Sequence, residues 1–129
     1  MAASTEHRLA AALLAALALP VQAASLACHV TYGGETRVIS AAPTSDPYSV
    51  APVAIGSFFL FRIVFRQEPA DLASIKLYTY ADHDSGPTLI HQATYPYPPP
   101  ASAFSGRHSV YEPLRDGELQ YWCELRKAP

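Results

Sequence analysis

Near the end of the chain, residues 118–125 read ELQYWCEL and alternate between two faces. One face carries Leu119, Tyr121, Cys123 and Leu125. The other face is polar apart from Trp122, which is the only tryptophan of the chain. An alternation of period two is typical of a β-strand with one buried face. This stretch therefore predicts a strand that turns a cysteine towards the core and Trp122 away from it.

The N-terminal segment, residues 1–23, has the pattern of a secretory signal peptide. A basic residue precedes an apolar run that Pro20 ends, and small residues follow at the positions that a signal peptidase reads. The run is shorter than the roughly 20 residues that span a bilayer, so an uncleaved anchor is the less favoured reading. We predict cleavage after Ala23, a single mature domain over residues 24–129 without a membrane span, and a periplasmic or secreted location.

Cys28 is the second cysteine, and the residues around it alternate in the same way. Leu26 and Val30 share its face, while His29 falls on the opposite face. Two cysteines of an exported protein usually pair, because the compartment is oxidising. We therefore predict a disulfide between Cys28 and Cys123, on strands that are adjacent or face each other. A link between positions so far apart stabilises a small domain by about 4 to 5 kcal/mol.

Lipidation of Cys28 is the alternative to a disulfide. Residues 25–28 read SLAC, close to the box at which bacterial lipoproteins are acylated, although such boxes prefer Leu at the position of Ser25. Acylation leaves Cys123 as an unpaired thiol, which is unusual for an exported protein. A catalytic thiol is not favoured either, because the alternation turns His29 away from Cys28.

The strongest strand pattern is PVAIGSFFLFRIVFRQ at residues 52–67. Its apolar row consists of Phe59, Phe61, Ile63 and Phe65. Arg62 and Arg66 lie on the opposite face, and we interpret the stretch as one long strand in which Gly56 marks a bulge or bend. Earlier in the chain, Gly33 and Gly34 separate two β-rich runs. This pair predicts a hairpin, because it tolerates the positive φ of a tight turn.

Turn residues separate the remaining strand-like runs, and no amphipathic helix is predicted outside residues 1–23. The segment YPYPPP at residues 95–100 predicts a stiff loop that covers a sheet edge, since proline lacks the donor that a β-ladder needs. The whole pattern amounts to about seven short strands. It predicts an all-β fold, an antiparallel β-sandwich with one disulfide, with a barrel as the alternative.

Two resemblances bear on fold and location. The stretch RDGELQYWC at residues 115–123 resembles the end of an immunoglobulin domain and implies an immunoglobulin-like sandwich, although no Trp follows the first cysteine here. The chain also resembles a group of small uncharacterised exported proteins of Gram-negative bacteria. The stretches that carry this resemblance are FRIVFRQEPADLASIKLYTYAD (61–82), LIHQATYPYP (89–98) and VYEPLRDGELQYWCEL (110–125). The group has no assigned activity, so the resemblance implies a periplasmic location rather than a chemistry.

Composition and motifs argue against several function classes. The formal net charge is −2 at pH 7 and no basic run is present, so nucleic-acid binding has no electrostatic support. The motifs HExxH, GxSxG and CxxC and the glycine loop that cradles phosphates are all missing from the sequence. We therefore predict a protein that is not an enzyme, needs no cofactor and has no nucleic-acid partner.

One polar string offers a weak metal site. Residues 81–86 read ADHDSG, in which Asp82, His83 and Asp84 supply oxygen and nitrogen ligands on an expected loop. Adjacent residues converge on one ion only in a tight turn and with help from another histidine. Copper(II) or zinc is the expected ion, because imidazole suits both. A solvated polar turn is the alternative.

Aromatic side chains suggest a binding surface. Tyr78, Tyr80 and Trp122 fall on faces opposite the apolar rows. Together with Arg62 and Arg66 they predict a patch that binds a protein or a sugar. Two further candidates are Tyr95 and Tyr97 in the proline-rich loop, a type of segment that docks on aromatic grooves.

We thus expect a non-enzymatic exported domain that binds another protein or an envelope component. A periplasmic copper- or zinc-binding protein is one alternative. An inhibitor of a lysozyme-type hydrolase is another, because FSGRHSVY at residues 104–111 resembles the loop that such inhibitors insert.

Overall fold

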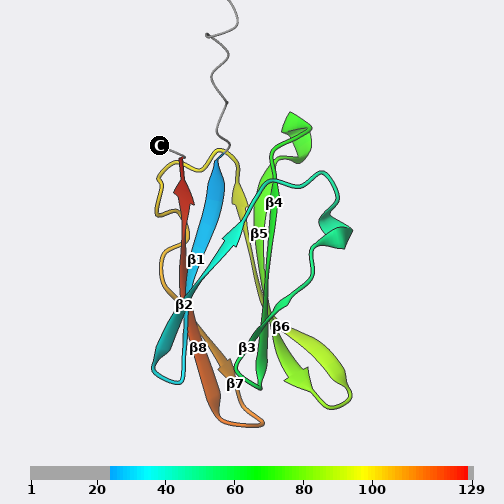
Figure 1. Ribbon diagram of the computed structural model, residues 1–129, viewed down its shortest axis with the longest axis vertical. Helices are drawn as coiled ribbons and strands as arrows, with labels where there is room; N and C mark the ends of the chain where they lie inside the picture. Colours follow the sequence, from blue (N-terminus) through cyan, green and yellow to red (C-terminus); the bar gives the residue numbers. More distant parts are fainter. Residues whose placement is uncertain (1–23, 128–129) are drawn as a thin grey trace, which may run out of the picture.

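The computed structural model describes residues 24–127, so the predicted signal peptide over residues 1–23 lies outside the described residues. In this part of the chain, eight strands form two antiparallel sheets of four, which lie against each other as two layers (Figure 1). The strands are β1 (Ser25–Tyr32), β2 (Glu35–Ala41), β3 (Val53–Ile55), β4 (Phe59–Arg66), β5 (Ser74–His83), β6 (Gly86–Pro96), β7 (His108–Glu112) and β8 (Gly117–Arg126). Two short 3-10 helices, η2 (Pro47–Ser49) and η3 (Ala70–Leu72), interrupt the connections. The predicted all-β sandwich is confirmed.

The two sheets are built differently. Sheet A has the strand order β2-β1-β8-β7, so that the first and last strands pair at its centre. Sheet B has the order β3-β4-β5-β6, a meander of consecutive strands. The two-layer architecture is that of immunoglobulin domains, but the strand order is different. The disulfide also joins neighbours within one sheet, whereas the immunoglobulin disulfide joins the two sheets.

Residues 52–67 form a hairpin rather than one long strand. β3 ends at Ile55 and pairs antiparallel with β4, which begins at Phe59. Gly56 has a φ of +59° in the connecting turn, and a Cβ atom built there lies 2.6 Å from Cε1 of Tyr32. The prediction of a bulge or bend at Gly56 was therefore wrong. The chain reverses at this glycine, and the reversal adds an eighth strand.

Of two other predicted connections, the hairpin at Gly33 and Gly34 is confirmed, and the proline-rich loop starts later than predicted. Gly33 and Gly34, with φ of +62° and +78°, connect β1 to β2 as the predicted hairpin. In contrast, the proline-rich segment predicted to be a loop from Tyr95 onward starts inside β6, which continues to Pro96. A proline is tolerated there because β6 is an edge strand of sheet B, where the ladder needs no donor on its outer side.

The core lies between the two sheets. From sheet B, the predicted apolar row Phe59, Phe61, Ile63 and Phe65 is buried, with exposed fractions of 4% or less. From sheet A, the facing residues are Leu26, Cys28, Val30, Leu119, Tyr121 and Cys123, all likewise buried. Phe61 and Tyr121 meet across the layers with ring centroids 5.1 Å apart. The period-two pattern therefore identified both inner faces correctly.

The predicted disulfide is formed at the centre of sheet A. Cys28 and Cys123 lie directly opposite each other on β1 and β8, with Cα atoms 4.1 Å apart and both side chains buried. The strands are thus adjacent, the first of the two arrangements expected. Because its sulfur is bonded to Cys123, Cys28 has no thiol for acylation, and the lipidation alternative is incompatible with this structure. Within residues 24–127, no helix has the length and apolar character needed to cross a membrane.

Candidate functional site

The residues predicted to form one aromatic binding surface lie on two opposite faces of the sandwich. Trp122 projects from the outer face of sheet A, opposite His29 on β1. Tyr78 and Tyr80 project from the outer face of sheet B, beside Arg62 on β4. Because the sheets pack through their inner faces, the two outer faces point in opposite directions (Figure 1). The prediction of a single surface was therefore wrong.

On the outer face of sheet B, Arg62 has a structural role. Its guanidinium donates hydrogen bonds to the carbonyl oxygens of Val50, at 2.8 Å, and of Pro47. The same group lies 5.1 Å from the ring centroid of Tyr78, which in turn is 6.3 Å from that of Tyr80. Arg62 thus anchors the loop around η2 to the sheet through two of its five N–H donors.

The other predicted residues are dispersed. Arg66, at the end of β4, donates to the carbonyl of Glu68 in the next connection. Tyr95 and Tyr97 are half-buried and pack against the core rather than facing solvent. Tyr97 contacts Phe65 with ring centroids 5.0 Å apart. Neither tyrosine therefore belongs to an outer aromatic surface.

Asp82, His83 and Asp84 lie where the chain turns from β5 into β6. Asp82 and His83 are the last residues of β5, and Asp84 is exposed in the turn. Across residues 24–127, no group of three or more His, Cys, Asp or Glu side chains is placed to hold a metal ion. The three residues therefore do not assemble into the metal site that their sequence suggested.

The best-formed polar site lies on the outer face of sheet A. On the central strands β1 and β8, Thr31 faces Gln120 and His29 faces Trp122. The rings of His29 and Trp122 stack with centroids 4.0 Å apart and an interplanar angle of 2°. On the neighbouring strand β2, Thr36 faces Thr31, and their hydroxyl oxygens are 2.7 Å apart. Aromatic and polar side chains thus stand in adjacent rows across three strands.

A hydrogen bond to Glu124 holds the His29 ring of the stacked pair. Nε2 of His29 lies 2.6 Å from a carboxylate oxygen of Glu124, and Nε of Arg126 lies 3.6 Å from the other oxygen. The hydrogen bond from His29, with a smaller contribution from the charge of Arg126, holds the pKa of Glu124 below its ordinary value. The carboxylate therefore fixes the orientation of the imidazole that covers one side of Trp122.

A cavity of about 260 Å³ lies against this surface. The residues that line it are His29, Thr31, Thr36, Arg107, Gln120, Tyr121 and Trp122. Its polar groups are hydroxyls, an amide, an imidazole and one guanidinium. Within residues 24–127, the side chains of Arg107 and Gln120 make no hydrogen bond or ion pair. We call this site the Trp122 groove, and its free donors are available to a ligand.

The segment 104–111, predicted as an inhibitory loop, is anchored to the molecule by Phe104, Ser105 and His108, and its second half belongs to β7. Phe104 packs edge-on against Tyr95, and the Ser105 hydroxyl accepts a 2.7 Å hydrogen bond from the backbone N–H of Cys123. His108 contacts Tyr95 inside the sandwich. Arg107, in contrast, is exposed and reaches the Trp122 groove. This segment therefore contributes one residue to the candidate site rather than a protruding loop.

A second polar cluster closes the edge between β6 and β7. The Tyr95 hydroxyl lies 2.9 Å from Nε2 of His108, and the Tyr121 hydroxyl lies 3.3 Å from Nδ1 of His91. The two imidazole centroids are 5.3 Å apart. Burial, with a smaller effect of His108, lowers the pKa of His91, and burial raises the pKa of Tyr95 and of Tyr121. These side chains bond to one another, so they join the two sheets rather than form an open site.

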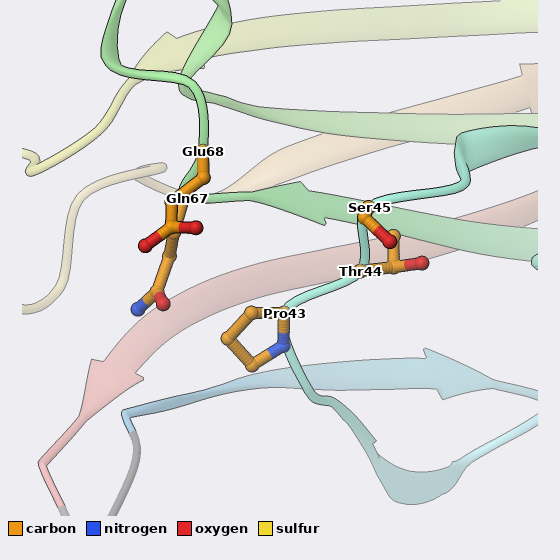
Figure 2. A pocket seen from close by; sticks show the side chains of 5 residues that line it. All are labelled: Pro43, Thr44, Ser45, Gln67 and Glu68. Atoms are coloured by element: carbon orange, nitrogen blue, oxygen red, sulfur yellow. The ribbon is translucent and has the colours of Figure 1, made fainter.

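A further cavity of about 120 Å³ lies between the loop after β2 and the end of β4 (Figure 2). It is lined by Pro43, Thr44, Ser45, Gln67 and Glu68. Figure 2 shows the Thr44 and Ser45 side chains pointing away from those of Gln67 and Glu68. The polar groups do not converge, so the Trp122 groove remains the stronger candidate.

The sequence pattern identifies only part of the Trp122 groove. Trp122 was selected, but His29, Thr31, Gln120 and Arg107 were not. The outward faces of residues 26–32 and 118–125 contained the first three. The missing information was that these two stretches are neighbours in one sheet. Comparisons of the chain with family models, with curated proteins and with solved structures find no match.

Proposed function

We propose that this protein is a non-enzymatic, exported binding domain that binds a component of the bacterial envelope in the Trp122 groove. The observation that carries the proposal is the combination of a partly exposed indole with unpaired hydrogen-bond donors around one cavity. Binding sites typically combine an aromatic surface with a few polar groups that fix the orientation of the ligand. Tryptophan and arginine are also the residues most enriched among those that dominate binding energy.

The rigidity of the groove supports a binding role. Its side chains stand on β1, β2 and β8, and the disulfide ties β1 to β8 one residue away from both His29 and Trp122. A site on rigid elements loses less conformational entropy on binding than one on mobile loops. The groove is thus organised before a ligand arrives.

The disulfide supports the proposed location. Cys28 and Cys123 are buried and paired, and paired cysteines persist in oxidising compartments such as the periplasm or the extracellular space. The signal-like pattern of residues 1–23 agrees with export. The ligand should accordingly be a molecule of the envelope or its surroundings.

Trp122 makes a direct test possible, because it is the only tryptophan and a fluorine label on its indole reports on the groove alone. The domain, labelled with 5-fluorotryptophan and followed by fluorine NMR, is titrated with the protein, lipid and polysaccharide fractions of a Gram-negative envelope. We expect one fraction to change the fluorine signal saturably. Gln120→Ala should weaken that response about tenfold, the equivalent of one net hydrogen bond.

The matched control is Tyr78→Ala, which changes the opposite outer face of the sandwich. It should leave the titration unchanged while circular dichroism confirms the fold of each variant. A response abolished by Tyr78→Ala and unaffected by Gln120→Ala places binding on sheet B and refutes the groove. The absence of any response to all three fractions refutes the proposed function.

A further inference from the structure

We infer that the ligand of the Trp122 groove is a saccharide, and that it binds more tightly when it carries a carboxylate. This inference rests on the proposed function and specifies its ligand class. Three features of the groove support the inference: the indole ring of Trp122, the polar side chains in the neighbouring rows, and the unpaired guanidinium of Arg107.

The aromatic ring suits the apolar face of a sugar. The face of an indole carries negative electrostatic potential, whereas the C–H groups on one side of a pyranose ring are weakly positive. Trp122 is partly exposed, and its orientation is fixed by the parallel stack on His29, which Glu124 holds in place. A fixed ring of this kind provides contact area at low entropic cost.

The polar rows suit the hydroxyl groups at the rim of the same sugar. Thr31 and Thr36 place two hydroxyls side by side, and Gln120 follows on the next strand. Each hydroxyl, and also the amide, both donates and accepts, as a sugar hydroxyl does. Adjacent strands lie about 4.8 Å apart, a spacing comparable to the width of a pyranose ring. Consecutive rows can therefore bond neighbouring hydroxyls of one sugar.

Other ligand classes fit the groove less well. A lipid chain needs an apolar lining, but the groove is lined mainly by hydroxyl, amide, imidazole and guanidinium groups. An extended peptide that adds a strand needs an unpaired sheet edge. The groove instead lies over β1 and β8, the central strands of sheet A. Its geometry thus favours a compact polar ligand with one apolar face.

Arg107 accounts for the expected preference for acidic sugars. Its side chain is exposed at the groove and has no carboxylate partner within residues 24–127. No Asp or Glu lines the cavity, and the nearby Glu124 is engaged by His29 and Arg126. A guanidinium binds a carboxylate through two parallel hydrogen bonds. A uronic acid should therefore bind more tightly than the neutral sugar of the same stereochemistry.

The test titrates Trp122 fluorescence with paired oligosaccharides, oligogalacturonate against neutral oligogalactose and oligoglucuronate against neutral oligoglucose. We expect saturable binding within at least one pair. At low salt, the acidic member should bind about three- to tenfold more tightly, and added salt should reduce this difference. Arg107→Gln should remove the difference, because it weakens the acidic member more than the neutral one.

Gln120→Ala should weaken both members of the pair about tenfold. Ser109→Ala, at an exposed position of β7 that faces Gln120, is the matched control and should weaken neither. Equal affinity for both members, unchanged by Arg107→Gln, refutes the acidic preference. A groove that responds to an envelope protein or lipid fraction but to none of the oligosaccharides refutes the saccharide and leaves the proposed function standing. No response to fractions or oligosaccharides refutes both.

Discussion

Cys28 faces Cys123 across β1 and β8, and the next residue pair along the same two strands is His29 with Trp122. Because successive side chains alternate between faces, the disulfide lies in the core and the stacked rings lie on the surface directly beyond it. The covalent bond fixes the register of β1 against β8, and this register brings the two rings together. The structural bond and the candidate site are therefore neighbours in a single ladder.

Removing the disulfide should destabilise the domain strongly. The bond joins residues that are 95 positions apart, and a cross-link over a loop of that length stabilises by about 4 to 5 kcal/mol. We expect the double variant Cys28→Ala, Cys123→Ala to lose about that much free energy of unfolding in a urea titration. Reduced wild-type protein should give a similar value. A loss below about 1 kcal/mol would contradict the role assigned to the bond.

The pKa of Glu124 should respond to its two partners in a defined order. The hydrogen bond from His29 is the largest cause of the lowered pKa, and the charge of Arg126 is a smaller one. His29→Ala should therefore raise the pKa of Glu124 more than Arg126→Gln does. An NMR titration of the Glu124 side-chain carboxyl in each variant measures both shifts. The reverse order would show that the stacked imidazole does not hold the carboxylate.

Stability should fall in mild acid because of His91. Burial lowers the pKa of its imidazole in the folded state, so the unfolded chain binds the proton more readily. The contribution of neutral His91 to the free energy of unfolding is complete above the unfolded pKa of about 6.5. It is lost as the pH falls below that value. Between pH 7.5 and 5, His91→Gln should reduce the slope of unfolding free energy against pH.

His108→Gln provides the comparison for that measurement. It removes only the smaller cause of the lowered pKa, the charge of the neighbouring imidazole. The slope should therefore fall by less than in His91→Gln. Comparing slopes rather than absolute stabilities separates titration from the loss of the Tyr121 hydrogen bond. A slope that His91→Gln leaves unchanged would rule out this histidine as the source of acid sensitivity.

The buried carboxylate of Glu112 should be important for the turn between β7 and β8. Its side chain is only 2% exposed, and its two oxygens accept hydrogen bonds from the backbone N–H groups of Leu114 and Arg115, both at 2.9 Å. Glu112→Gln replaces one acceptor by a donor and should cost about 1.5 to 3 kcal/mol in urea unfolding. Glu118→Gln, at an exposed position of β8, should change stability by less than about 0.5 kcal/mol.

The sequence was most informative where local pattern decides structure. The alternation around Cys28, Cys123 and Phe61 identified buried faces, and the conformational freedom of Gly33 and Gly34 identified a turn. Gly56 was misread because a glycine in a β-rich stretch fits a bulge as well as a reversal. The ring of Tyr32, which occupies the space beside it, comes from a distant part of the chain. That contact is tertiary and leaves no local pattern.

The candidate site illustrates the same limit. Alternation separates inward from outward residues within each strand, but it does not say which strands share a sheet. Tyr78 and Trp122 were grouped because both point outward, whereas their strands belong to opposite layers. Arg107 was not recognised because it precedes β7, and only the pairing of β7 with β8 brings it near Trp122. The strand order is therefore needed to decide which of the outward-facing residues are neighbours and form one site.

The position of the disulfide also determines how the domain responds to tension. Ser25 pairs with Arg126, so a force that pulls these two residues apart separates the end of the β1–β8 ladder one residue pair at a time. The pairs Ser25–Arg126, Leu26–Leu125 and Ala27–Glu124 open first, and the load then passes to the covalent bond between Cys28 and Cys123. The chain between the cysteines carries none of that load. Even under strain, the backbone of the residues that line the Trp122 groove should therefore keep its arrangement, because all of them lie between the two cysteines.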